Sequence, residues 1–217
     1  ANLPLGRDRT TQALIGSDVI WRLGEGTLGI GAFGGKTKTT FRQNLTGFVL
    51  DELAGKPPTA SDDAEQVNDA WTAGLTVLYR HGVKLTSPRD AFEVGVSARV
   101  DSVDQTDTRL LPDGHKQSAL VDDTVNATNI GAYADAALYP IKRVVIRGGP
   151  RLDSLSFSTK DRLGNAGIER TAQGFHAGAK VTVDVAAGGG VHAVASYGDG
   201  FRSPQARELV EGERVPF

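Results

Sequence analysis

The sequence predicts an all-β fold, an antiparallel transmembrane β-barrel, from three features: alternating apolar and polar residues, runs of strand length, and turns between the runs. The clearest run covers residues 91–101 and is apolar at every second position, at Phe92, Val94, Val96, Ala98 and Val100. A second run covers residues 175–185 and repeats the pattern at Phe175, Ala177, Ala179, Val181, Val183 and Val185. Both match the roughly 9–11 residues with which a tilted strand crosses a bilayer.

Weaker alternation elsewhere brings the expected strands to about eight, in meander order. They lie near residues 10–23, 27–44, 68–85, 90–106, 127–139, 142–158, 172–186 and 190–202. Aromatic residues such as Trp21, Trp71 and Tyr139 fall near strand ends, where the interfacial girdle of a barrel would lie. Pro150 interrupts one strand, and we expect a bulge or a lost hydrogen bond there because proline cannot donate to a ladder.

The connections are expected to alternate between short turns and long loops. Tight turns are predicted at residues 24–26, 86–89, 139–141 and 187–189, and long polar links at about 45–67, 107–126 and 159–171. Outer-membrane barrels alternate in this way, with brief periplasmic turns and extended external loops. A soluble β-sandwich, the alternative, gives no reason for every second connection to be long.

Charged residues inside the alternating runs define a second face. A lysine or arginine facing lipid at the midplane costs about 2–4 kcal/mol, so these side chains are affordable only toward water inside a barrel. The lumen-facing candidates are Arg99, Asp101, Arg147, Arg151, Lys180 and Asp184.

Composition narrows the function. The 217 residues carry a net charge of −2, so no global field recruits nucleic acid. The absence of cysteine excludes disulfides, thiolate metal sites and cysteine nucleophiles. No run of 18 apolar residues could form a transmembrane helix. The sequence lacks methionine and a leader-like start, and we expect a mature product or an internal fragment.

A glycine-rich segment invites a nucleotide-binding interpretation that its context contradicts. Residues 29–34 match G-x-G-x-x-G, but residues 38–42 are β-favouring and offer no helix N-terminus for a phosphate. A P-loop would also need a glycine at position 30, which is Ile30 in this sequence. Small residues that relieve crowding in a curved strand explain the glycines better.

Histidine and acidic residues are the other candidates for chemistry. None of the four histidines, His81, His115, His176 and His192, lies in a metal-binding motif. His176 and His192 are expected on facing strands, both pointing inward, so a metal site there remains an alternative to two isolated polar residues. The acidic residues at 61–65 and 122–123 are expected in external loops, without EF-hand spacing. No catalytic residue, cofactor or resident metal is predicted, and the protein is expected not to be an enzyme.

The most specific motif lies in residues 195–209. An aromatic residue is followed by G-F-R-x-P and then by E-L, at Tyr197, Gly200, Phe201, Arg202, Pro204, Glu208 and Leu209. This segment resembles a mid-to-late barrel strand of TonB-dependent outer-membrane receptors, at the point where that strand runs out into a loop. The hairpin at residues 130–153 is similar to the recurrent hairpin of that family, with a G-x-Y strand, a proline turn and a strand that closes in R-x-D. Residues 73–101 repeat the theme more loosely.

The resemblance implies a ligand-gated importer in the outer membrane of a Gram-negative bacterium. Its partners would be membrane lipid, a scarce nutrient such as an iron–siderophore complex or cobalamin, and TonB, which acts through an N-terminal plug. The family barrel has about 22 strands, whereas this sequence shows about eight and no plug-like segment. Residues 1–217 are therefore expected to form a partial receptor barrel without its plug. A complete eight-stranded barrel with a structural or adhesive role is the alternative.

Overall fold

The computed structural model describes residues 7–44, 49–53, 55, 63–111, 114–163 and 169–200. These residues form eight strands, β1 (Arg7–Leu23), β2 (Gly26–Asn44), β3 (Asp63–Gly82), β4 (Ala91–Leu110), β5 (Lys116–Ile141), β6 (Val144–Asp161), β7 (Glu169–Gly188) and β8 (Val191–Gly198), and one short helix, α1 (Val49–Leu53). Each strand pairs antiparallel with the next, so the sheet order is the chain order. The predicted all-β antiparallel meander is confirmed. The short helix between β2 and β3 was not predicted.

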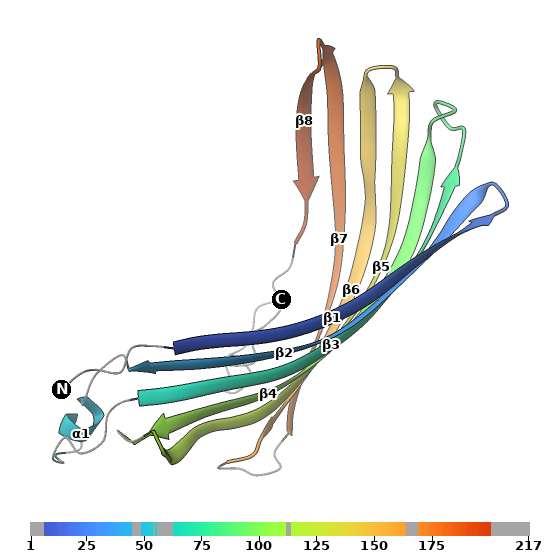
Figure 1. The fold of residues 1–217 in the computed structure, drawn as a ribbon. Coiled ribbons are helices and arrows are strands. Elements are labelled where there is room, and N and C mark those ends of the chain that lie inside the picture. Colours follow the sequence, from blue (N-terminus) through green and yellow to red (C-terminus); the bar gives the residue numbers. More distant parts are fainter. Residues whose placement is uncertain are drawn as a thin grey trace.

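The sheet is twisted, curved and open (Figure 1). β1 and β8 lie at its two edges, and each has one strand neighbour among the described strands. A complete eight-stranded barrel would pair β1 with β8. The eight described strands therefore form an open wall and not the closed small barrel of the alternative.

Glycine makes two of the turns tight. Gly189 and Gly190 join β7 to β8 with φ values of 61° and 81°, as a type I′ hairpin turn requires at both central positions. Gly24, with φ of 60°, opens the turn between β1 and β2. These turns lie at one end of the sheet, called here the turn end, and the opposite end is called the loop end.

The strands at the loop end are longer than predicted. The expected link at 107–126 is wrong: β4 and β5 continue through most of it, and only residues 111–115 connect them. Asp122 and Asp123 accordingly lie in β5 and not in a loop, and Asp63 and Glu65 lie in β3. Apolar alternation ends where a strand leaves the apolar layer, but the hydrogen bonds of the ladder continue between polar residues. The alternation therefore underestimated the length of these strands.

Pro150 interrupts the ladder between β5 and β6 without a bulge. Tyr133 pairs with Arg151 and Ala136 with Gly148 in one unbroken register, while the pairs between them are missing. The ladder pairing is lost at Pro150, as expected, and no residue is inserted as a bulge would require. Gly149 allows close approach here, because a Cβ atom at this position would collide with the carbonyl group of Ala134.

Register aligns the apolar positions of successive strands on one face, called here the apolar face. Cross-strand partners share a face, and one row runs from β3 to β7 through Leu75, Ala98, Ile130, Ser154 and Phe175. The opposite side is called the polar face.

The apolar run shifts along the strands from one strand to the next. Leu75 is the centre of the run 71–79 on β3, but its row partner Phe175 is the first residue of the run 175–185 on β7, whose centre is five residues further on. Five residues at ~3.3 Å each, over four strand spacings of ~4.8 Å, correspond to a strand tilt of about 40° relative to a level apolar band. Transmembrane barrels have tilts of roughly 35–45°.

Candidate functional site

Burial in this sheet is inverted relative to a water-soluble domain. Large apolar side chains are exposed, including Val96 at 51%, Ile130 at 54% and Phe175 at 67%. The buried apolar residues among those described are Leu110 and Leu155. The buried polar residues are Asp63, Asp90, Thr108, Asp135, Asp153 and Thr159. An apolar face this extensive needs an apolar neighbour, since soluble monomers rarely expose large contiguous apolar patches.

No helix among the described residues is long and apolar enough to span a membrane.

All six lumen-facing candidates lie on the polar face. Arg99 pairs with Asn129, which pairs with Leu155, and Lys180 pairs with Gly149, so alternate positions of β4 to β7 share this side. Whether the polar face lines a lumen remains a prediction.

Two of the candidate arginines are held by carboxylates two residues further along the same strand. Arg99 Nε donates to Asp101 Oδ2 at 2.8 Å, and Arg151 Nε donates to Asp153 Oδ2 at 2.7 Å. In each pair Nη2 donates to the second carboxylate oxygen, so both pairs are bidentate. The guanidinium groups are thereby oriented along the strand while more than half of each arginine side chain stays exposed.

Asp135 is, with Asp153, one of two nearly buried carboxylates of this face, and sequence reasoning did not select it. It is 4% exposed. Arg147 Nε from β6 donates to its Oδ1 at 2.9 Å, and Lys180 Nζ from β7 lies 3.5 Å from its Oδ2. The carboxylate of Asp135 on β5 therefore contacts side chains of β6 and β7 at the point where Pro150 interrupts the ladder. Nearby, the Tyr133 hydroxyl donates to Glu93 Oε1 at 2.8 Å.

A hollow of about 580 Å³ lies on the polar face across β4 to β7. Its lining combines the two bidentate pairs with the apolar side chains Leu155 and Phe157. Asp199, just beyond β8, also borders it. This surface presents oriented charges of both signs beside an aromatic ring. It can contact a polar solute, and each of its two arginines keeps its carboxylate partner.

The register excludes a metal site shared by His176 and His192, which was the alternative to two isolated polar residues. His176 pairs across the sheet with Asp153, whereas His192 pairs with Ala186, ten residues further along β7. That separation is about 33 Å along the strand. His192 Nδ1 instead lies 2.8 Å from Asp184 Oδ1. No group of three metal-ligating side chains is present in the described part of the chain.

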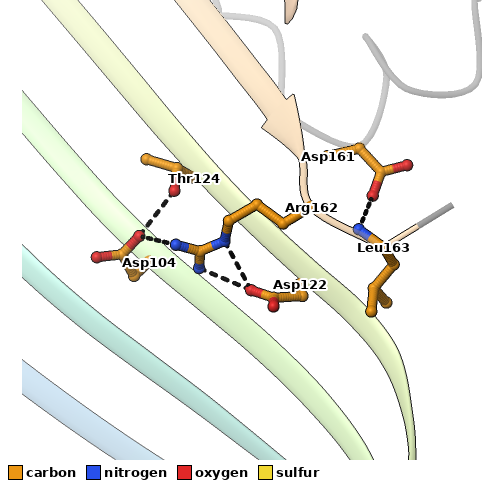
Figure 2. A network of polar contacts seen from close by, with 6 residues as sticks. All are labelled: Asp104, Asp122, Thr124, Asp161, Arg162 and Leu163. Atoms are coloured by element: carbon orange, nitrogen blue, oxygen red, sulfur yellow. Dashed lines mark hydrogen bonds and ion pairs between the residues drawn. The ribbon is translucent and has the colours of Figure 1, made fainter. Parts of the chain in front are cut away.

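The acidic residues at the loop end form a structural network (Figure 2). Arg162, at the end of β6, reaches Asp122 Oδ1 on β5 at 2.7 Å and Asp104 Oδ1 on β4 at 3.1 Å. The Thr124 hydroxyl also donates to Asp104, at 2.8 Å. One guanidinium thus links the ends of three strands on the apolar-face side, beyond the apolar run.

Asp90 organises the turn between β3 and β4, a role that sequence reasoning missed. Its carboxylate is 1% exposed and accepts hydrogen bonds from the backbone N–H groups of Thr86 and Ser87, and from that of Tyr139 in the neighbouring hairpin. The guanidinium of Arg89 lies 4.5 Å from the centre of the Tyr139 ring. Burial raises the pKa of Asp90, but the hydrogen bonds outweigh it and lower the pKa to about 2.

The family-motif residues are only partly described. Tyr197 lies on the apolar face of β8, and its hydroxyl donates to Asp199 Oδ1 at 3.1 Å. Gly200 follows the strand. The remaining motif residues, Phe201, Arg202, Pro204, Glu208 and Leu209, lie outside the described residues.

Comparison with known proteins identifies a structural likeness. No protein-family model and no curated protein matches the sequence. Among solved structures, the chain is similar to the ferric citrate transporter FecA in its unliganded form, with a TM-score of 0.77 and 14% identity. The fold is that of a transmembrane β-barrel wall. The match covers 98% of this chain and 30% of the transporter chain, so this chain spans less than a third of its length.

Proposed function

We propose that this chain forms part of the barrel wall of an outer-membrane transporter that imports a scarce nutrient, such as an iron–siderophore complex or cobalamin. The observation that carries the proposal is the exposed apolar face whose run shifts along the strands as a tilted transmembrane wall requires. The likeness to a ferric citrate transporter and the motif around Gly200 favour import over a purely structural role.

The two faces of the wall would then have different roles. The apolar face contacts membrane lipid, and the polar face lines the aqueous path. Arg99, Arg151 and Asp135 are each held by an opposite charge, so a passing solute meets a hydrated surface with charges already oriented. Long-lived capture by a single unpaired charge is thereby avoided.

TonB is the proposed energy source. It would act through a plug, as the resemblance of residues 195–209 to the receptor family implies. The bacterial outer membrane is the proposed location.

Location is tested by fractionation. The full protein that contains this chain is produced in a Gram-negative host with an outer-membrane signal sequence, and the membranes are separated by density. We expect it in the outer-membrane fraction, with slower electrophoretic mobility after boiling because the barrel then unfolds. Recovery as a folded soluble monomer would contradict the proposal.

Transport is tested by deleting the gene in its own host. Uptake of ⁵⁵Fe-citrate, of ⁵⁵Fe bound to a panel of siderophores and of ⁵⁷Co-cobalamin is measured with and without a functional TonB. We expect one of these uptakes to fall to the level of the TonB-deficient strain. Unchanged uptake of every probe would contradict nutrient import, and a loss that is independent of TonB would reject TonB as the energy source.

A further inference from the structure

A basic hollow lies on the apolar-face side of β1 and β2, near the loop end. Arg9, Thr11 and Ala13 of β1 pair across the sheet with Thr40, Lys38 and Lys36 of β2. These six side chains line a hollow of about 560 Å³, called here the basic patch.

The charge of this region is not neutralised within the described part of the protein. Lys36 Nζ lies 3.2 Å from Asp69 Oδ1, and Arg42 Nη2 lies 3.1 Å from Glu65 Oε2. Arg9 and Lys38 form no ion pair or side-chain hydrogen bond with any described residue. The charged side chains of these rows on β1 to β3 are five cations and two carboxylates, a net charge of +3: Arg7, Arg9, Lys36, Lys38, Arg42, Glu65 and Asp69.

The neighbouring acidic residues do not compensate for this excess. In the row of Lys38 and Asp69, the next position on β4 is Asp104, which already contacts Arg162 and Thr124. The positive charge is therefore concentrated at β1 and β2.

The basic patch begins where the apolar run ends. Lys36 pairs with Trp71, the first residue of the apolar run of β3, and Tyr79 stands at the other end of that run. The run from Trp71 to Tyr79 measures about 26 Å along the strand, which at the tilt of about 40° is a height of ~20 Å, comparable with the ~25 Å apolar band of a transmembrane barrel. The rows from Lys36 to Thr40 extend up to ~13 Å further along the strand, a height of ~10 Å at that tilt, and therefore cross the headgroup layer of ~5–8 Å.

We propose that the basic patch binds the phosphate groups of an anionic lipid in the leaflet at the loop end of the sheet. This inference rests on the proposed membrane location of the wall. Lys36 and Lys38 supply point charges, Arg9 supplies a fork that can hold a phosphate through two parallel N–H donors, and the hydroxyls of Thr11 and Thr40 add donors between them. Membrane depth and the uncompensated charge favour a lipid phosphate over a free anion.

The test uses the full protein that contains this chain, reconstituted into nanodiscs. The discs hold phosphatidylcholine with a small fraction of either phosphatidylglycerol or the diphosphorylated lipid A, and lipid that stays bound after transfer to detergent is counted by native mass spectrometry. The patch variant is Arg9→Gln with Lys38→Gln. The matched control is Lys142→Gln with Arg143→Gln, which removes the same charge from the turn between β5 and β6 at the opposite end.

We expect the patch variant to retain about 25-fold less anionic lipid than the wild type, since each basic residue near an anionic surface contributes about fivefold. The control variant should lose several-fold less lipid than the patch variant, because Lys142 and Arg143 are exposed in a turn and line no described hollow that could hold a phosphate. Equal retention by the patch variant and the wild type, with both showing the same heat-dependent mobility, would overturn the proposal. Displacement of the lipid by millimolar inorganic phosphate would overturn it in favour of a free-anion site.

Failure of this inference and failure of the proposed location give different results. Wild-type protein that does not enter phosphatidylcholine discs at all would refute the membrane location. Wild-type protein that enters those discs but retains no anionic lipid would refute the lipid site alone.

Discussion

The two faces of β4 differ in which kind of side chain is exposed, although they share one backbone. Val96 stands on the apolar face and is half exposed, whereas its neighbour Ser97 lies on the polar face beside Tyr133 and the ion pairs. In a soluble sandwich the apolar side would be the buried one. The difference predicts that the apolar face contacts a less polar medium than the charged face does, and substitutions on the two faces should separate these environments.

The largest expected effect comes from a charge on the apolar face. Val96→Arg, at the centre of the apolar run of β4, should lower the free energy of unfolding of the full protein in lipid vesicles by about 2–4 kcal/mol, because the guanidinium would face hydrocarbon. Ser97→Arg is the matched control on the polar face, where the arginine reaches water. Denaturant titration in vesicles measures both, and equal losses would contradict the assignment of the two faces.

The next effect concerns the enclosed carboxylate of the polar face. Asp135→Asn should lower the free energy of unfolding by about 1–3 kcal/mol, less than for a fully buried pair because Arg147 and Lys180 are largely exposed. Asp101→Asn removes a carboxylate from a more exposed pair and should cost less than about 1 kcal/mol. Denaturant midpoints measure the two variants, and an equal cost would show that enclosure of Asp135 contributes nothing.

A local effect is expected at the turn between β3 and β4. The pKa of Asp90 in the folded protein, about 2, lies below its ordinary value of 3.8, so its stabilising contribution is complete above that ordinary value and is lost as the pH falls toward 2. Hydrogen exchange at the Tyr139 amide, after correction for intrinsic exchange, should therefore accelerate between about pH 4 and 2. Asp90→Asn should accelerate it already at neutral pH and remove this acid dependence. An acid dependence that persists in the variant would exclude Asp90 as its source.

The smallest effect is expected at the loop-end network. Arg162→Gln removes contacts to Asp104 and Asp122, but these side chains are substantially exposed, so the cost should be about 0.5 kcal/mol at low ionic strength. At 1 M salt, where the Debye length is ~3 Å, the difference from wild type should disappear. Unfolding measured at both salt concentrations tests this, and a salt-independent loss above about 1 kcal/mol would show a role in packing.

The two faces could be predicted from the sequence because alternation is a property of each strand alone. Val96 and Arg99 are assigned to opposite sides by counting, without knowledge of any partner. Strand ends were less predictable, since Thr108 and Thr124 continue the ladder after the apolar pattern has stopped. The strands therefore extend past the boundaries that periodicity gave.

The polar contacts depend on register, which no single strand reveals. Asp90 meets Tyr139 across 49 positions of sequence. Asp135 meets Lys180 only because β5, β6 and β7 align in one particular register. His176 and His192 show the opposite case, in which neighbouring strands and a shared face were predicted but the distance along the strand was not.

The shift of the apolar run along the sheet also sets the width of any passage. At a tilt of about 40°, each strand occupies ~6 Å of circumference, so eight strands would enclose a ring only ~16 Å across between backbones. Side chains would fill such a ring, as they fill small eight-stranded barrels. Eight strands at this tilt can therefore border a nutrient-sized path only as one arc of a wider barrel, and about 22 strands at the same tilt would give a ring ~44 Å across.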